Sequence, residues 1–273
     1  MKIACQEHIV PGQTFQEKVD NLVALGFEGV ELNAGFDPKG GSTLNGRIEE
    51  IKKAIEGSGL GVSSICGGQP MTFVVADPAQ RRTAIDGYKQ SLRIAGELGA
   101  NGPILVPIFG GPQLSDVSPV KTPVQLEEML LVAVCKELAP VAAENKTNVV
   151  LEPLNRYETH LLRTLDQAVS ICKRAGNPKG LKIMGDFFHM NIEEADIAKS
   201  IRKAGKYICH IHLADSTRME PGTGHTDFRA GFKALKDVKY KGYMAFECGV
   251  SGKDRMVSLK KSVEYLKEIR ESV

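Results

Sequence analysis

Short apolar runs alternate along the chain with longer segments that have the periodicity of amphipathic helices. The runs cover residues 2–5, 29–32, 62–66, 103–107, 149–152, 182–185, 208–213 and 243–247. The helical segments include residues 15–26, 47–59, 123–144 and 165–176, and several close with the glycine expected after a helix end. Strands that are apolar throughout are typical of a parallel sheet covered on both faces. The alternation predicts an α/β fold.

The number of strand–helix units decides between two α/β architectures. Eight units in 273 residues match a single (β/α)8 TIM barrel better than a doubly wound open sheet. The chain has no Pro/Ser-rich linker and no low-complexity tract that would divide it. We therefore expect residues 1–273 to form one barrel domain.

Composition and charge exclude several classes of function. The chain is 42% hydrophobic and 25% charged, and it has no apolar run of membrane-spanning length. Its first residues, MKIACQEHIVPG, lack the apolar core and cleavage site of a signal peptide. The 35 basic and 33 acidic residues are spread evenly, so no basic stripe marks a nucleic-acid surface. We expect a cytoplasmic protein with a small-molecule partner.

The six cysteines contain no C-x-x-C pair and lie mostly in apolar runs. Thiols in such runs behave as small hydrophobic side chains. We therefore expect buried, reduced cysteines.

Four consecutive predicted strands each carry one potential metal ligand at the carboxyl end, namely Glu152, Asp186, His212 and Glu247. In a barrel of this kind the strand ends meet at one mouth, where active sites lie. Each residue alone could be a helix cap or a core histidine. Together, three carboxylates would repel one another unless a cation lay between them. The pattern predicts a divalent metal site, and its oxygen-rich ligands suit Mn²⁺, Co²⁺ or Mg²⁺.

Two features of the seventh predicted strand and its loop leave alternatives open. His210 and His212 are expected on the same face of the strand, so the alternation of side chains along a strand does not say which imidazole binds the metal. The PGTG turn at residues 221–224 is either a glycine-held loop or a cradle for a sugar phosphate.

Four sequence blocks are similar to those of the sugar isomerase and epimerase barrels related to D-tagatose 3-epimerase, D-psicose 3-epimerase and endonuclease IV, in the xylose isomerase-like superfamily. The blocks are LEPLNRYETHLL (151–162), GDFFHMNIEE (185–194), HIHLADSTRMEPGTGHTDF (210–228) and FEC (246–248). The resemblance covers nearly the whole chain. It selects His212 as the ligand and implies one divalent ion, Mn²⁺ or Co²⁺ in preference to Mg²⁺.

The same resemblance implies roles around the ion. Glu152 and Glu247 are expected to exchange the substrate proton. Further residues are expected to contact the sugar: Glu158, His189 in a loop after the sixth strand, Arg218 and Cys66. The resemblance also implies a homodimer or homotetramer.

The activity that this resemblance implies is 3-epimerisation of a free keto sugar of the D-allulose/D-fructose, D-tagatose or L-ribulose type. A carboxylate removes the C3 proton, the metal stabilises the cis-enediolate, and the second carboxylate returns a proton to the opposite face. Hydroxypyruvate isomerase, inosose isomerase or dehydratase, and phosphosugar epimerase share this logic. A non-catalytic sugar-binding barrel and an endonuclease IV-like nuclease fit less well, because all the proton-transfer residues are present and the extra histidines are not.

Substrate preference is not set by these blocks. The best-known ketose 3-epimerases place tryptophans along the pocket, whereas this chain has no tryptophan and offers Phe109 in the VPIFGG loop. A smaller, different or phosphorylated sugar is therefore compatible with the sequence.

Overall fold

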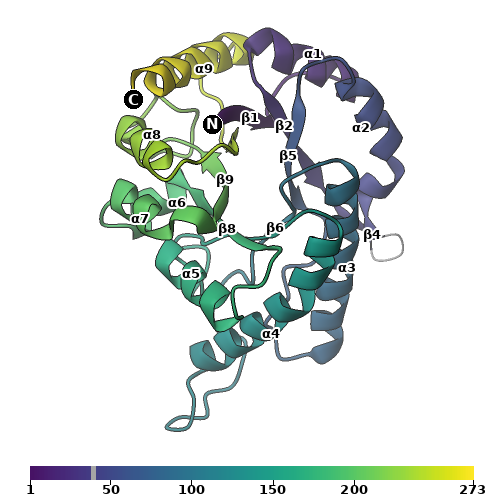
Figure 1. Cartoon of the computed structure of the whole chain (residues 1–273), viewed down its shortest axis with the longest axis vertical. Coiled ribbons are helices and arrows are strands. Elements are labelled where there is room, and N and C mark those ends of the chain that lie inside the picture. The colour runs from purple at the N-terminus through teal and green to yellow at the C-terminus, as the bar shows by residue number, and fades with distance from the viewer. Residues whose placement is uncertain (38–40) are drawn as a thin grey trace.

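The computed structural model, which describes residues 1–37 and 41–273, has a ring of helices around a barrel of parallel strands (Figure 1). Within these residues the barrel sheet has eight strands in the order β5-β2-β1-β10-β9-β8-β7-β6. An isolated parallel bridge between Ile65 and Pro103 joins its two outer strands. The predicted (β/α)8 barrel is confirmed, and the open doubly wound sheet is not formed. The strands are β1 Lys2–Gln6, β2 Gly29–Ala34, β5 Gly61–Gly67, β6 Ile104–Leu105, β7 Val149–Leu151, β8 Leu181–Asp186, β9 Ile208–Leu213 and β10 Tyr243–Phe246.

The helices cover the outside of the barrel and include all four segments predicted from periodicity. They are α1 Phe15–Leu25, α2 Ile48–Ile55, α3 Pro78–Glu97, α4 Pro123–Glu144, α5 Leu165–Arg174, α6 Phe187–Glu193, α7 Ile197–Ala204, α8 Phe228–Asp237 and α9 Arg255–Ser272. Two short strands, β3 Phe36–Asp37 and β4 Gly41–Ser42, form an antiparallel pair beside the barrel. Two 3₁₀ helices, η1 Thr43–Gly46 and η2 Gly205–Tyr207, complete the described elements.

Threonine capping boxes begin three of these helices. Thr14, Thr122 and Thr164 each accept a hydrogen bond from the backbone N–H three residues later, and the side chain at that later position bonds back. Such reciprocal bonds satisfy two backbone donors that a helix start leaves unpaired. At the other end of α1, Gly26 has φ of 85°, a left-handed conformation that favours glycine. Local sequence therefore sets where these helices begin and end.

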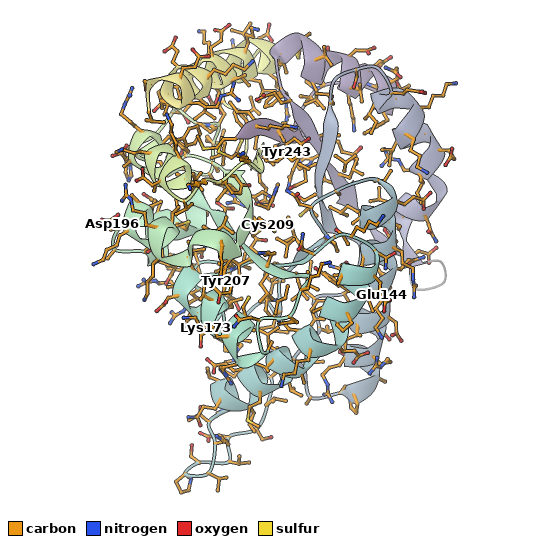
Figure 2. The ribbon with its side chains drawn as sticks, viewed as in Figure 1. Glu144, Lys173, Asp196, Tyr207, Cys209 and Tyr243 are labelled. Atoms are coloured by element: carbon orange, nitrogen blue, oxygen red, sulfur yellow. The ribbon has the colours of Figure 1, made fainter. Side chains whose placement is uncertain are left out.

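Aromatic side chains pack α6 against α8. The ring of Phe187 is stacked on Phe228 at 5.5 Å and meets Phe232 edge-on at 6.4 Å. All three side chains are buried. Figure 2 shows side chains filling the space inside the ring of helices, while the charged Lys173 and Asp196 lie toward its outside. This packing fixes α6, which begins at the residue after the end of β8.

The barrel has two register shifts. Between β2 and β5, Val30 pairs with Val62 but Leu32 pairs with Ile65, so Glu31 lies opposite two residues. Between β8 and β9, Ile183 pairs with Ile208 but Met184 pairs with His210, which leaves Cys209 extra. Such irregularities re-aim side chains and are common beside active sites.

The cysteines are free, and three of them, Cys5, Cys135 and Cys172, are buried while the other three are half-buried. Among the described residues, no helix combines the length and the apolar character needed to cross a membrane.

Candidate metal centre

The four predicted metal ligands meet at the carboxyl ends of adjacent strands. Glu152 directly follows β7, Asp186 ends β8, His212 lies in β9, and Glu247 directly follows β10. One potential ligand atom from each lies within 4.8 Å of those of the other three. The barrel topology therefore brings Glu152 close to Glu247, which is 95 positions further along the chain.

Two buried atoms at this centre lack a hydrogen-bond partner among the described residues, namely His212 Nδ1 and Glu152 Oε1. His212 Nδ1 is 2.9 Å from a carboxylate oxygen of Glu247, 3.6 Å from Glu152 and 3.8 Å from Asp186. Unpartnered buried polar atoms are costly unless a ligand satisfies them. An imidazole nitrogen facing three carboxylates is a donor set that fits a divalent cation such as Mn²⁺.

Burial and neighbouring charges shift the titration of this cluster. Burial raises the pKa of Glu152 above its usual value of 4.5. Burial alone would lower the pKa of His212, but the carboxylates of Glu247 and Glu31 outweigh it and raise that pKa well above 6.5. For Asp186, burial is outweighed by the Arg218 guanidinium, which holds the pKa well below its usual value. A metal ion bound here would therefore compete with protons for Glu152 and His212.

Arg218 contacts two carboxylates of the cluster. Its guanidinium bonds Asp186 Oδ2 at 2.5 Å, contacts Glu247, and lies 4.8 Å from the centre of the Phe188 ring. Its backbone φ of 61° is rare for a residue with a side chain, and such strain is concentrated at functional sites. The structure thus brings Arg218 to the carboxylate cluster.

His189 also reaches the centre, but the sequence-based expectation that it lies in a loop was wrong. It is in α6 and only 2% exposed, because the chain turns directly from β8 into this helix. Its Nε2 is 3.6 Å from an oxygen of Asp186 and 3.9 Å from one of Glu152.

Asn155, which sequence reasoning did not single out, orients His189. The Oδ1 of Asn155 accepts from the backbone N–H of Tyr157, so its Nδ2 is the donor side. That Nδ2 donates to His189 Nδ1 at 2.8 Å and to Glu158 Oε1 at 2.7 Å. His189 Nδ1 therefore accepts, and Nε2 carries the proton toward the centre. Only its position inside the block 151–162 could have drawn attention to Asn155.

The two remaining predicted contact residues are at the rim. Glu158 has a side chain that is 41% exposed, and Cys66 is half-buried with its Sγ 3.9 Å from Glu247 Oε1. Burial, reinforced by Glu247, raises the pKa of the Cys66 thiol well above its usual value. Cys66 is therefore a neutral lining side chain. Phe109, on the loop after β6, is 49% exposed.

Tertiary structure separates the two histidines of β9. Both are buried, but His210 Nε2 bonds Glu31 at 2.7 Å, whereas only His212 belongs to the group with Glu152, Asp186 and Glu247. His212 Nε2 also bonds Glu31, at 2.9 Å. The two histidines, which strand alternation left equivalent, therefore differ in their position along the barrel: His212 lies among the three carboxylates, whereas His210 lies beside Glu31.

The backbone of the PGTG turn is hydrogen-bonded to Asp215, which lies earlier in the same loop. Asp215 Oδ2 accepts the backbone N–H groups of Gly222 at 2.8 Å and Thr223 at 3.1 Å. These donors are therefore already used and are not free for a phosphate. The glycine-held loop is the alternative that the geometry favours.

Comparison with known proteins gives consistent similarities. The sequence profile described as xylose isomerase-like TIM barrel matches residues 19–269. A protein of Escherichia coli (strain K12) named 3-dehydro-D-guloside 4-epimerase is 33% identical over 272 residues, covering 98% of this chain and 99% of the relative. A ketose 3-epimerase of Arthrobacter globiformis is 30% identical, covering 90% and 83%. The crystal structure of the apo form of an E. coli 3-keto-D-glucoside 4-epimerase superimposes with a TM-score of 0.87, at 30% identity and coverage of 98% and 99%.

Proposed function

The chain belongs to the xylose isomerase-like TIM barrel family, and we propose that it is a metal-dependent sugar epimerase that inverts a carbon next to a ketone. The observation that carries the proposal is the convergence of Glu152, Asp186 and Glu247 on Nδ1 of His212 at the barrel mouth. Glu152, Asp186, His212 and Glu247 would hold one divalent ion. When bound, the ion would polarise the ketone and neighbouring hydroxyl oxygens and so make the carbon proton more acidic.

The chain's own residues supply the proton transfer. Inversion needs one group to remove the proton and another to return a proton to the opposite face. Glu152 and Glu247 come from non-adjacent strands, β7 and β10, with β8 and β9 between them. They are therefore placed to approach a bound sugar from two sides.

Other side chains orient the sugar. His189 presents its Nε2–H toward the centre, as set by Asn155. Arg218 offers a guanidinium that is held over Phe188 and that can bond substrate oxygens. Glu158 and Cys66 lie beside these groups, where Glu158 accepts from Asn155 and the Cys66 thiol contacts Glu247. These contacts would bind the hydroxyl groups and keep the reacting carbon between the two carboxylates.

Two substrate classes satisfy this chemistry. In a free ketose the C3 proton is next to the C2 ketone, and in a 3-keto glycoside the C4 proton is next to the C3 ketone. The similarity to the E. coli 4-epimerase spans both chains almost completely, which favours the 3-keto glycoside. The similarity to ketose 3-epimerases favours the free ketose. Since the PGTG turn uses its own donors internally, we propose a sugar without a phosphate.

Solvent deuterium exchange followed by NMR tests the function. With Mn²⁺ present, deuterium should enter at C3 of D-fructose, D-tagatose, D-psicose or L-ribulose, or at C4 of a methyl 3-keto-hexoside, together with inversion at that carbon. Exchange at C1 instead would indicate an aldose–ketose or hydroxypyruvate isomerase. An absence of exchange with every one of these sugars in the metal-loaded protein would contradict the proposal.

Metal affinity should depend on pH because protons and the metal compete for the same atoms. In the metal-free cluster the pKa of His212 is raised above 6.5, so the proton on His212 stabilises the metal-free protein in full below about pH 6.5. That stabilisation is lost as the pH rises through the raised pKa. The apparent affinity for Mn²⁺ should therefore increase by roughly tenfold per pH unit for each proton released. Titration calorimetry in buffers of different ionisation enthalpy measures the number released. A pH-independent affinity from about pH 6 to 8 would contradict this expectation.

A further inference from the structure

Beneath the metal centre lies a buried carboxylate that the proposed reaction does not use. Glu31, on β2, is 0% exposed. It accepts from Gln6 Nε2 at 2.7 Å, from His210 Nε2 at 2.7 Å and from His212 Nε2 at 2.9 Å, and it also accepts from the hydroxyl of Ser64. These donors come from strands β1, β9 and β5, and the register shift at Glu31 turns the side chain to meet them.

The number of donors determines which nitrogen of His212 carries a proton. An ionised carboxylate can only accept, and it has about four lone-pair positions. The four donors around Glu31 fill these positions. His212 must therefore present an N–H at Nε2, which leaves Nδ1 able to give its lone pair to a metal ion among Glu152, Asp186 and Glu247. A carboxylate behind a metal-binding histidine fixes both its tautomer and its ring orientation.

Gln6 connects the same carboxylate to a second ligand. Its Nε2 donates to Glu31 Oε1 at 2.7 Å and to Glu247 Oε1 at 3.2 Å, and the side chain is 2% exposed. The amide thus spans the space between Glu31 and the proposed metal ligand on the neighbouring strand β10. Two of the four ligands, His212 and Glu247, are held by one buried network.

We propose that Glu31 is the positioning residue of the metal centre: it sets the tautomer and direction of His212 and, through Gln6, the direction of Glu247. This inference rests on the metal site of the proposed function. Both side chains are buried beside the proposed ligands, so we expect their effect to be on metal binding and only through it on turnover.

A second metal ion held by Glu31, His210 and His212 is the alternative use of the same atoms, since these residues also have ligand atoms close together. The donors on Glu31 argue against it. Gln6 and Ser64 already occupy both of its oxygens, and His212 Nε2 serves Glu31 as a donor. We therefore expect one Mn²⁺ per chain.

The test is the Mn²⁺ affinity of Glu31→Gln, measured by calorimetry and by electron paramagnetic resonance. The amide has only one acceptor oxygen, and its NH₂ group favours the wrong tautomer of His212, so affinity should fall by about 10- to 100-fold. The ¹⁴N coupling of a Mn²⁺-bound imidazole should be present in the parent protein and lost in the variant.

Glu127→Gln is the matched control. Glu127 is also a fully buried glutamate that accepts from a histidine, His160, and from the backbone N–H groups of Gln113 and Leu114, but it contacts none of the proposed ligands. Its Mn²⁺ affinity should match that of the parent protein. If Glu31→Gln does not fold, Gln6→Met keeps the test open, with an expected several-fold loss of affinity.

The possible outcomes are distinguishable. Unchanged affinity and ¹⁴N coupling in Glu31→Gln would overturn the inference, as would two Mn²⁺ per parent chain. An equal loss of affinity in Glu127→Gln would also overturn it, because general destabilisation would then account for the effect. An absence of Mn²⁺ binding by the parent protein would instead overturn the proposed metal site itself.

Discussion

Replacing either Glu152 or Glu247 by glutamine is expected to lower the rate of epimerisation by about a hundredfold to ten-thousandfold at saturating Mn²⁺. Glutamine has nearly the same shape but cannot accept a proton from carbon. Each replacement also removes one anionic oxygen from the centre, so the bound Mn²⁺ must be measured alongside the rate. The proton-transfer role predicts loss of turnover even in molecules that retain the metal.

Isotope exchange separates the two carboxylates. If each serves one face of the sugar, each single variant should retain some exchange of the proton facing the remaining carboxylate, while inversion is lost in both. Glu220→Gln is a suitable control, because the carboxylate of Glu220 is buried in the loop after β9 and accepts from the N–H and hydroxyl of Ser251 rather than facing the cluster. Near-normal epimerisation rates in both Glu152→Gln and Glu247→Gln would rule out this mechanism.

Truncating Phe187 to alanine is expected to lower the free energy of unfolding by about 3–5 kcal/mol. The ring is fully buried between Phe228 and Phe232, so its removal leaves a cavity and also separates α6 from α8. Denaturant unfolding of the metal-free protein measures the change. Phe109→Ala is the control, because that ring is 49% exposed and its loss should alter stability by only about 0.5 kcal/mol. A change below about 1 kcal/mol for Phe187→Ala would contradict the packing described above.

Phe187 also links stability to the site. It is the first residue of α6, directly after Asp186, and the same helix carries His189. Loss of the ring should therefore loosen a proposed metal ligand, Asp186, and a proposed substrate contact, His189, together. This coupling arises because the barrel leads from strand end to helix start without an intervening loop at β8.

Much of the architecture could be predicted from sequence because it depends on local patterns. Apolar runs and helical periodicity identified all eight barrel strands and the helices 15–26, 47–59, 123–144 and 165–176, with shifts of a few residues at their ends. The candidate metal ligands could be placed for a related reason. In a barrel the strand end is a structural position, so a residue such as Glu152 or Glu247 can be placed at the mouth from its place in the chain.

The supporting residues could not be predicted in the same way. Glu31 lies within an apolar run, and no local rule says that its carboxylate will meet His212, which is 181 positions away along the chain. Asn155 gives no local sign that it orients His189. These contacts depend on inter-strand register, including the shift between Val30 and Leu32, and register is a property of the assembled sheet.

The amino-acid sequence by itself determined the barrel, the strand ends and the kinds of side chain that meet there, because periodicity and order along the chain are enough for each. Strand alternation left the two histidines of β9 equivalent; the family resemblance selected His212, and the tertiary structure places it among the carboxylates. Only the tertiary structure decided that His189 is buried in a helix and that the PGTG turn is bonded to Asp215. The physical reason is that depth in a barrel, tautomer and hydrogen-bond partner depend on atoms from several strands at once, which no single segment contains.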